Sequence, residues 1–179
     1  TGLTTPALAA GFIIAYADHV SPRYETDVIE LGTIPGLIAG RWCVDEGRIY
    51  LTGHSDGASV ASLLVIYDDI SPLPAAIAPS AAGVNSSFLA SVSCTGPVPV
   101  MVIHASGDTL FPGYGREAAD WWLGCFDCDA TTPAPLPDGC LPYTGCTDGV
   151  EVQYCEWAGA HGNWPSHLNA SIINFFQRF

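Results

Sequence analysis

Residues 48–65 decide the fold and read Arg48-Ile-Tyr-Leu-Thr-Gly53-His-Ser55-Asp-Gly57-Ala-Ser-Val-Ala-Ser-Leu-Leu-Val65. A β-branched and aromatic run precedes the pentapeptide Gly-His-Ser-Asp-Gly, and a small and apolar run follows it. This order of strand, turn and helix is the sequence form of a nucleophile elbow. The turn is strained, so we expect the positions that flank the serine to need residues without bulky side chains. The elbow further predicts an acid and then a histidine, each directly after a later strand.

Length and composition limit the classes of protein to which the chain can belong. The chain has 179 residues, about half of them hydrophobic, which is enough for one domain at 1–179 with a substantial core. No apolar run reaches the roughly 18–20 residues that span a bilayer. Eighteen acidic residues against five arginines give a net charge of −13. That charge argues against nucleic acid and against anionic membrane surfaces as partners.

Seven cysteines are many for this length and predict disulfides, and therefore a secreted, extracellular protein. The alternative is zinc, because Cys125 and Cys128 have ligand spacing. A zinc site would need a second tight pair, whereas Cys140 and Cys146 are six residues apart. We therefore expect no metal and no cofactor. An odd number leaves one thiol free or paired outside the chain. The cysteines are Cys43, Cys94, Cys125, Cys128, Cys140, Cys146 and Cys155.

Strand-like and helix-like runs alternate, which predicts an α/β fold with a mostly parallel sheet and helices on both faces. Pro35-Gly36 should kink or break one of the helices. Residues 125–149 form a long cysteine-rich loop insertion, which we expect to be stapled by disulfides. The expected strands are 12–16, 48–53, 75–78, 98–104 and 150–157, and the expected helices are 26–40, 55–67, 113–124 and 166–178.

An acid and a histidine follow later strands, as the elbow requires. Asp108 ends the run that contains the 98–104 strand, where a carboxylate can orient an imidazole. His161 follows the last strand among small residues and is the candidate general base for Ser55. His167 is the rival, but it falls inside the expected final helix. His104 is expected to be a strand-end histidine with satisfied hydrogen bonds. The order serine, aspartate, histidine is that of α/β-hydrolases.

Asp56 follows the nucleophile directly. Its backbone N–H is expected to be one donor of the oxyanion hole, the set of N–H groups that binds the negatively charged oxygen of the reaction intermediate. Its side chain has two simpler roles, in which it is solvated or caps the following helix.

The residues of the chain resemble the feruloyl esterase and polyhydroxybutyrate depolymerase-like branch of the secreted α/β-hydrolases. The likeness lies in five stretches: 11–18, 41–57, 102–112, 140–146 and the Gly-x-His…Trp-Pro pattern around His161. It implies the α/β-hydrolase fold, with Ser55 as nucleophile, His161 as base and Asp108 as orienting acid. The chain departs from the family pattern in two places. Ala58 replaces a second glycine after the elbow, and Gly162-Asn163 separate the histidine from Trp-Pro.

The resemblance also implies that the chain is shortened at its N-terminus. Family members open with further strands and a His-Gly-Gly-like loop that supplies a second oxyanion donor, and residues 1–10 look like the helix after that loop. A missing strand would lie between the 12–16 strand and the elbow strand. Leaving that place empty would leave buried backbone groups unpaired. Either the 12–16 strand pairs directly with the elbow strand, or a separate N-terminal peptide or segment fills the gap.

The odd cysteine count fits that separate segment. Cys43 and Cys94 both precede sheet strands, at the same end of the sheet, so we expect them to form one disulfide. The remaining pairs should staple residues 125–155.

The sequence therefore predicts a serine carboxylesterase that acts through an acyl-enzyme. Its substrates would be feruloyl or acetyl esters of plant polysaccharide, or short aliphatic or hydroxyalkanoate esters. Trp164 and Phe111, and also Trp121 and Trp122, are candidates for apolar walls around the acyl group. One alternative is a peptidase with the same fold. The other is a non-catalytic or incomplete hydrolase-like module that needs a separate N-terminal segment.

Overall fold

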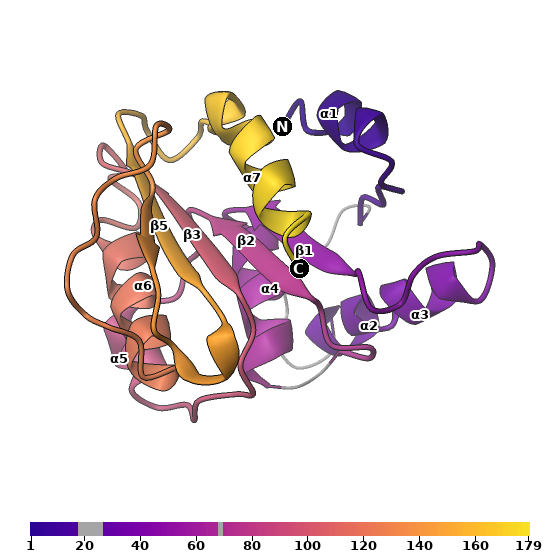
Figure 1. Ribbon diagram of the computed structural model, residues 1–179, viewed down its shortest axis with the longest axis horizontal. Coiled ribbons are helices and arrows are strands. Elements are labelled where there is room, and N and C mark those ends of the chain that lie inside the picture. The colour runs from indigo at the N-terminus through magenta and orange to yellow at the C-terminus, as the bar shows by residue number, and fades with distance from the viewer. Residues whose placement is uncertain (18–26, 68–69) are drawn as a thin grey trace.

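The computed structural model describes residues 1–17, 27–67 and 70–179, in which five strands form one sheet in the order β1-β2-β3-β5-β4 (Figure 1). Neighbours among β1, β2, β3 and β5 run parallel, and β4 pairs antiparallel with β5 at one edge. The predicted, mostly parallel α/β sheet is confirmed. The strands are β1 Tyr50–His54, β2 Ala76–Ser80, β3 Val100–Ala105, β4 Leu141–Tyr143 and β5 Val152–Trp157.

Helices cover both faces of the sheet (Figure 1). Val100 and Val102 of β3 pack with α4 and α6 on one face, whereas Met101 and Ile103 pack with α7 on the other. This alternation follows from the two-residue period of a strand. The helices are α1 Thr4–Ala9, α2 Asp27–Gly32, α3 Ile34–Ala39, α4 Asp56–Ile66, α5 Ser86–Leu89, α6 Tyr114–Cys125 and α7 Asn169–Phe176, with 3-10 turns at Thr147–Gly149 and Ser166–Leu168.

Most of the predicted elements are present, with some differences at their ends. The expected helix 26–40 begins outside the described residues and is two helices, α2 and α3. The break lies at Thr33, before Pro35 rather than at Pro35-Gly36. Pro35 is tolerated because it lies in the first turn of α3, where its missing N–H has no helical partner to lose.

The prediction of a strand at 12–16 is wrong. Residues 12–17 have no regular secondary structure, and within the described part of the chain β1 pairs only with β2. A groove of about 1210 Å³ is lined by both segments, through Phe12 and Ile14 and, from β1, Tyr50 and Thr52. The Phe12 and Tyr50 rings meet edge-on, with centroids 5.6 Å apart. Residues 12–16 therefore have no neighbouring strand to bond, and direct pairing with the elbow strand does not occur. Asp18, which ends the family-like stretch 11–18, lies outside the described residues.

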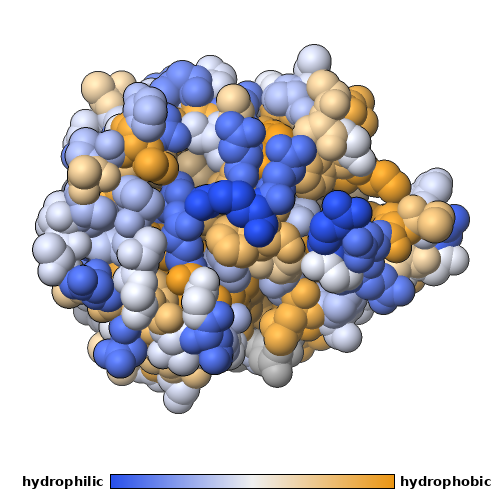
Figure 2. Space-filling view, in the orientation of Figure 1, coloured by the Kyte–Doolittle hydropathy of each residue, from blue (hydrophilic) through white to orange (hydrophobic). Residues whose placement is uncertain are grey.

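The side of the molecule next to this groove exposes hydrophobic side chains. In Figure 2 hydrophobic residues interrupt the hydrophilic surface on the right-hand side, over α1 and α3. Every residue of β1 is half-buried, whereas β2 and β3 are buried along their whole length. Among the described residues of the first 42 positions, the large hydrophobic residues that are at least half exposed are Leu8, Ile13, Tyr16, Ile29, Leu37 and Trp42.

Three disulfides join Cys94 to Cys125, Cys128 to Cys146 and Cys140 to Cys155. The last two staple the 125–149 loop, as predicted, and the loop also contains the short strand β4. Because Cys125 and Cys128 belong to two different disulfides, they do not form a zinc pair.

The predicted Cys43–Cys94 disulfide is wrong. Cys43 is a free, exposed thiol. It precedes β1, while Cys94 precedes β3, and β2 lies between these two strands. Cys94 is instead bonded to Cys125, the last residue of α6, and α6 packs on β3, the strand that follows Cys94.

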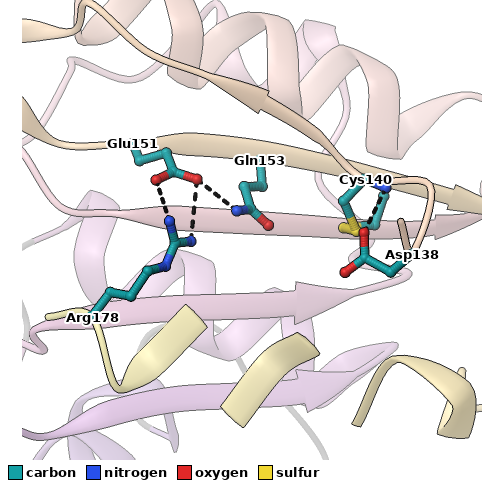
Figure 3. Close-up of a disulfide and its surroundings, with 6 residues drawn as sticks. Asp138, Cys140, Glu151, Gln153 and Arg178 are labelled. Carbon is teal, nitrogen blue, oxygen red and sulfur yellow. Dashed lines mark hydrogen bonds and ion pairs between the residues drawn. A yellow bond between two sulfur atoms is a disulfide. The ribbon is translucent and has the colours of Figure 1, made fainter. Parts of the chain in front are cut away.

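A disulfide and an ion pair fasten the last strand to its surroundings (Figure 3). Cys140 binds Cys155 of β5, and the Cys140 N–H donates to Asp138 Oδ1 at 3.0 Å. The Arg178 guanidinium, just after α7, donates to both carboxylate oxygens of Glu151 at 2.6 and 3.2 Å. The strand that precedes His161 is therefore fastened at two points, directly before its first residue and again at Cys155.

No helix of the described residues is long and apolar enough to span a bilayer.

Candidate active site

Ser55 lies at the turn between β1 and α4, with φ 55° and ψ −115°. Its N–H donates to the backbone O of Ser80 at the end of β2, at 2.9 Å. The turn is tight because β1 approaches α4 closely: a Cβ on Gly53 would lie 2.4 Å from the carbonyl carbon of Gly57. Gly57 itself has open space around it. Of the two flanking positions predicted to need a small residue, only Gly53 is sterically constrained.

The structure brings Ser55, His161 and Asp108 together from the ends of three parallel strands, β1, β5 and β3. Ser55 Oγ is 2.8 Å from His161 Nε2, and His161 Nδ1 is 2.8 Å from Asp108 Oδ2. The two residues between the histidine and Trp-Pro therefore leave the ring within reach of the serine. His167 is exposed and lies against Trp157.

Asp108 is buried and surrounded by donors. The backbone N–H groups of Leu110 and Phe111 each donate to Oδ1 at 2.9 Å, and Oδ2 faces His161. Burial alone would raise the pKa of the Asp108 carboxyl, but the hydrogen bonds from Phe111, His161 and Leu110 outweigh it and lower the pKa. The carboxylate is therefore ionised at neutral pH and is oriented by two backbone groups.

His104 behaves differently from the sequence prediction, which gave it satisfied hydrogen bonds. The residue is buried, and neither ring nitrogen has a hydrogen-bond partner among the described residues. Its Nε2 lies 3.8 Å from Asp108 Oδ2. The prediction is wrong because the His104 side chain packs against α6 at Gly115, where an added Cβ would lie 2.3 Å from His104 Cβ and 2.4 Å from Cγ of the ring. Burial lowers the pKa of His104 despite the nearby carboxylate, so the ring is neutral at pH 7.

Asp56 is the first residue of α4, directly after Ser55. The first N–H groups of a helix have no partner within the helix, and those of α4 receive no side-chain cap from Ser55. The Asp56 N–H is therefore next to Ser55 and is not used by the helix. The structure has no substrate, so its role as an oxyanion donor stays a prediction.

Of the four predicted wall aromatics, Phe111 lies beside His161 and Trp164 lies beside the His54 ring. The Phe111 ring meets the His161 ring edge-on, with centroids 4.9 Å apart. Trp164 lines the groove, and its Nε1–H donates to Asn169 Oδ1 at 2.7 Å. Trp122 is buried in the core and Trp121 packs against that core, so both have a packing role instead.

The sequence reasoning missed His54 and Ser80. These residues are partners in the β1–β2 register, which no local pattern reveals. Both ring nitrogens of His54 have hydrogen-bond partners in the structure.

Comparisons with known proteins agree with this architecture. No protein-family model matches the chain. The chain is 29% identical over 173 residues to the putative esterase NocK of Nocardia uniformis subsp. tsuyamanensis, an alignment that covers 89% of this chain and 46% of that protein. The chain therefore spans just under half the length of this relative.

Two solved structures have a similar fold. Acetyl xylan esterase from Aspergillus awamori matches with a TM-score of 0.56 and 16% identity, over 83% of this chain and 67% of that one. Arabidopsis thaliana SOBER1 matches with a TM-score of 0.54 and 14% identity, over 88% of this chain and 67% of that one. Together with the sheet order and the elbow, these likenesses assign the chain to the α/β-hydrolase fold.

Proposed function

We propose that the chain is a serine hydrolase of carboxylic esters that works through an acyl-enzyme. The observation that carries the proposal is the pair of 2.8 Å contacts that joins Ser55 Oγ to His161 and His161 to Asp108. These contacts lie on a strained turn that exposes a serine at a helix N-terminus, which is the arrangement of an activated nucleophile. The esterase name of the sequence relative supports the same chemistry.

In the proposed reaction, Ser55 Oγ attacks the ester carbonyl carbon while His161 Nε2 takes the hydroxyl proton. The bond to the alcohol oxygen then breaks, and His161 returns the proton to the leaving alcohol. Water, deprotonated by His161, attacks the acyl-enzyme and releases the acid and free Ser55. The ionised Asp108 stabilises the imidazolium formed in each step.

Each donor to the oxyanion of the tetrahedral intermediates raises kcat by about 10²- to 10³-fold, so one donor supports a slower reaction than two. The Asp56 N–H is one, and we propose that a separate N-terminal peptide or segment, outside residues 1–179, supplies the second. The groove supports this proposal, because it follows the edge of β1 that pairs with no strand of residues 1–17, 27–67 and 70–179. The exposed hydrophobic residues beside the groove and the exposed Cys43 that lines it support the proposal as well. Mass spectrometry of the intact, non-reduced protein checks whether a second peptide is bound through that thiol.

The proposed substrates are feruloyl or acetyl esters of plant polysaccharide, or short aliphatic or hydroxyalkanoate esters. Phe111, beside His161, and Trp164, which lines the groove next to His54, would form apolar walls for the acyl group. Three disulfides and the acidic charge fit our proposal that the protein is secreted, with neither nucleic acid nor membrane as a partner.

Turnover of p-nitrophenyl acetate and butyrate tests the ester chemistry, with Ser55→Ala as the matched control. The wild-type chain should hydrolyse both esters and take up a fluorophosphonate label on Ser55, and the variant should do neither. Methyl ferulate, acetylated xylan and hydroxybutyrate oligomers then separate the substrate classes.

The alternative is an incomplete module that needs the separate segment before it can act. The half-buried nucleophile strand favours this possibility, because a parallel strand of an α/β sheet is ordinarily buried. If folded wild-type chain shows neither serine-dependent turnover nor fluorophosphonate labelling, the catalytic proposal for residues 1–179 is wrong and the alternative stands.

A further inference from the structure

A second chain of hydrogen bonds runs beside the contacts of Ser55, His161 and Asp108. His54 Nε2 is 2.6 Å from the backbone O of His161, and His54 Nδ1 is 3.1 Å from Ser80 Oγ. We propose that His54 is a positioning residue, which holds the loop that carries His161 in register with the nucleophile. The inference rests on the proposed function, because it concerns how the same site is kept in working geometry.

The chemistry of the partners sets the direction of both hydrogen bonds. A carbonyl oxygen only accepts, so His54 Nε2 must carry the proton and donate it to His161 O. In the neutral ring Nδ1 is then an acceptor, and the Ser80 hydroxyl donates to it. Every polar atom of the His54 ring therefore has a partner of matching kind, and the ring is fixed in one tautomer.

Ser80 connects this chain of hydrogen bonds to the nucleophile. It ends β2 opposite His54 in the parallel register and is only 1% exposed. Its backbone O accepts from the Ser55 N–H at 2.9 Å, while its hydroxyl faces the His54 ring. One residue of a fully buried strand thus positions the backbone of the nucleophile and, through His54, the backbone of the base.

The loop that carries His161 needs such support. Residues 158–165 link β5 to the turn before α7, and most of them are exposed or half-exposed. Small residues surround the histidine, and the other backbone hydrogen bonds of the loop include Gly107 N–H to Gly159 O and Asn163 N–H to Ala160 O, each at 3.0 Å. A displacement of about 1 Å in a reacting group lowers turnover by as much as about 100-fold.

The ring of His54 also packs within the site. Its centroid lies 5.7 Å from that of His161 and 6.1 Å from that of Trp164. The informative substitutions of His54 are therefore those that remove its hydrogen-bonding nitrogens but keep a side chain of similar volume. Leucine keeps an apolar side chain of comparable size, whereas glutamine keeps an N–H group able to reach a carbonyl oxygen.

The kinetic test compares His54→Leu with His54→Gln by p-nitrophenyl butyrate turnover. We expect kcat to fall by about 10- to 100-fold in H54L with KM changed by less than about threefold, because the loop rather than the ester site is loosened. H54Q should recover kcat to within about fivefold of the wild type. Wild-type kcat in H54L, or equal losses in both variants, would overturn the inference.

A second measurement needs no turnover and so separates this inference from the proposed function. Hydrogen exchange at the amides of Asn163 and Gly107 should be faster in H54L than in wild type and H54Q, with exchange in β3 unchanged. If the wild type hydrolyses no ester, the proposed function fails and the exchange result still decides the role of His54. Unchanged exchange at both amides in H54L contradicts that role.

Discussion

His104 and Asp108 lie side by side behind the His161 ring, and their environments favour opposite charges. Burial keeps the His104 imidazole neutral, while hydrogen bonds keep the Asp108 carboxylate ionised. Both shifts are downward, so each group binds its proton less readily in the folded state than in the unfolded state. By linkage, both make the folded protein less stable as the solution becomes more acidic.

His104 and Asp108 affect the free energy of unfolding in different pH ranges, so the contribution of His104 can be measured separately. The unfolded histidine takes up a proton as the pH falls through about 6.5, whereas the folded one does so only at lower pH. Protonation of the Asp108 carboxylate does not lower the free energy of unfolding until the pH approaches about 4. Between pH 7 and pH 5 the wild type should therefore lose more free energy of unfolding than His104→Gln, by at most about 1.4 kcal/mol per pH unit. Urea denaturation at pH 7, 6 and 5 checks this, and parallel pH slopes would contradict it.

At the scale of elements, the approach of β1 to α4 creates the elbow. The Cβ of a residue 53 other than glycine would collide with the backbone of Gly57, and that backbone cannot move without moving Ser55. The steric constraint thus comes from the packing of two elements and not from the backbone angles of Gly53.

Gly53→Ala and Gly57→Ala form a matched pair that tests this view. G53A should lower the free energy of unfolding by about 1–3 kcal/mol, as overpacking does. G57A meets no atom within 4 Å and lies in a helix, so its stability should be unchanged or raised by up to about 1 kcal/mol. Urea denaturation of the two variants is the measurement, and equal losses would show that both glycines are sterically required.

The disulfides join elements that are distant along the chain. Cys94 and Cys125 are 31 residues apart and link the segment before β3 to the end of α6. Cys140 and Cys155 are 15 residues apart and link the segment before β4 to β5. Loop-closure entropy stabilises the longer loop more, since a longer loop has more freedom to lose in the unfolded state.

Replacing Cys94 and Cys125 together by alanine should lower the free energy of unfolding by about 3–4 kcal/mol. Replacing Cys140 and Cys155 in the same way should cost about 3 kcal/mol. Urea denaturation under non-reducing conditions compares the two, with an alanine at the free Cys43 as the control that leaves every disulfide intact. A larger loss for the 140–155 pair would show that strain or packing outweighs loop entropy.

At the scale of the whole molecule, the charge of −13 is the dominant electrostatic feature. Folding brings these charges closer together, so their repulsion destabilises the compact state at low salt. Sodium chloride at 0.5 M reduces the Debye length to a few ångströms and screens that repulsion.

Thermal unfolding at pH 7 should therefore shift upward with added sodium chloride. A gain of about 1 kcal/mol corresponds to about 2–4 °C for a protein of this size. The same titration near pH 4.3, the isoelectric point of the sequence, is the control, because the net repulsion vanishes there. An equal shift at both pH values would assign the effect to salting-out instead of charge screening.

The sequence by itself determined the elbow at Ser55 and the placement of Asp108 and His161 after later strands. These inferences succeed because they rest on local patterns, and because the carboxyl ends of parallel strands meet at one edge of the sheet. Tertiary structure alone decided which strands are neighbours. Among the described residues, that arrangement leaves 12–16 without a strand to pair with and sets His54 opposite Ser80, and the packing of α6 on β3 joins Cys94 to Cys125 and not to Cys43. The tertiary structure also buries His104 with no hydrogen-bond partner in the part of the chain that the structure describes, because its side chain packs against α6. Each of these outcomes depends on contacts between segments far apart in the chain, which no local pattern encodes.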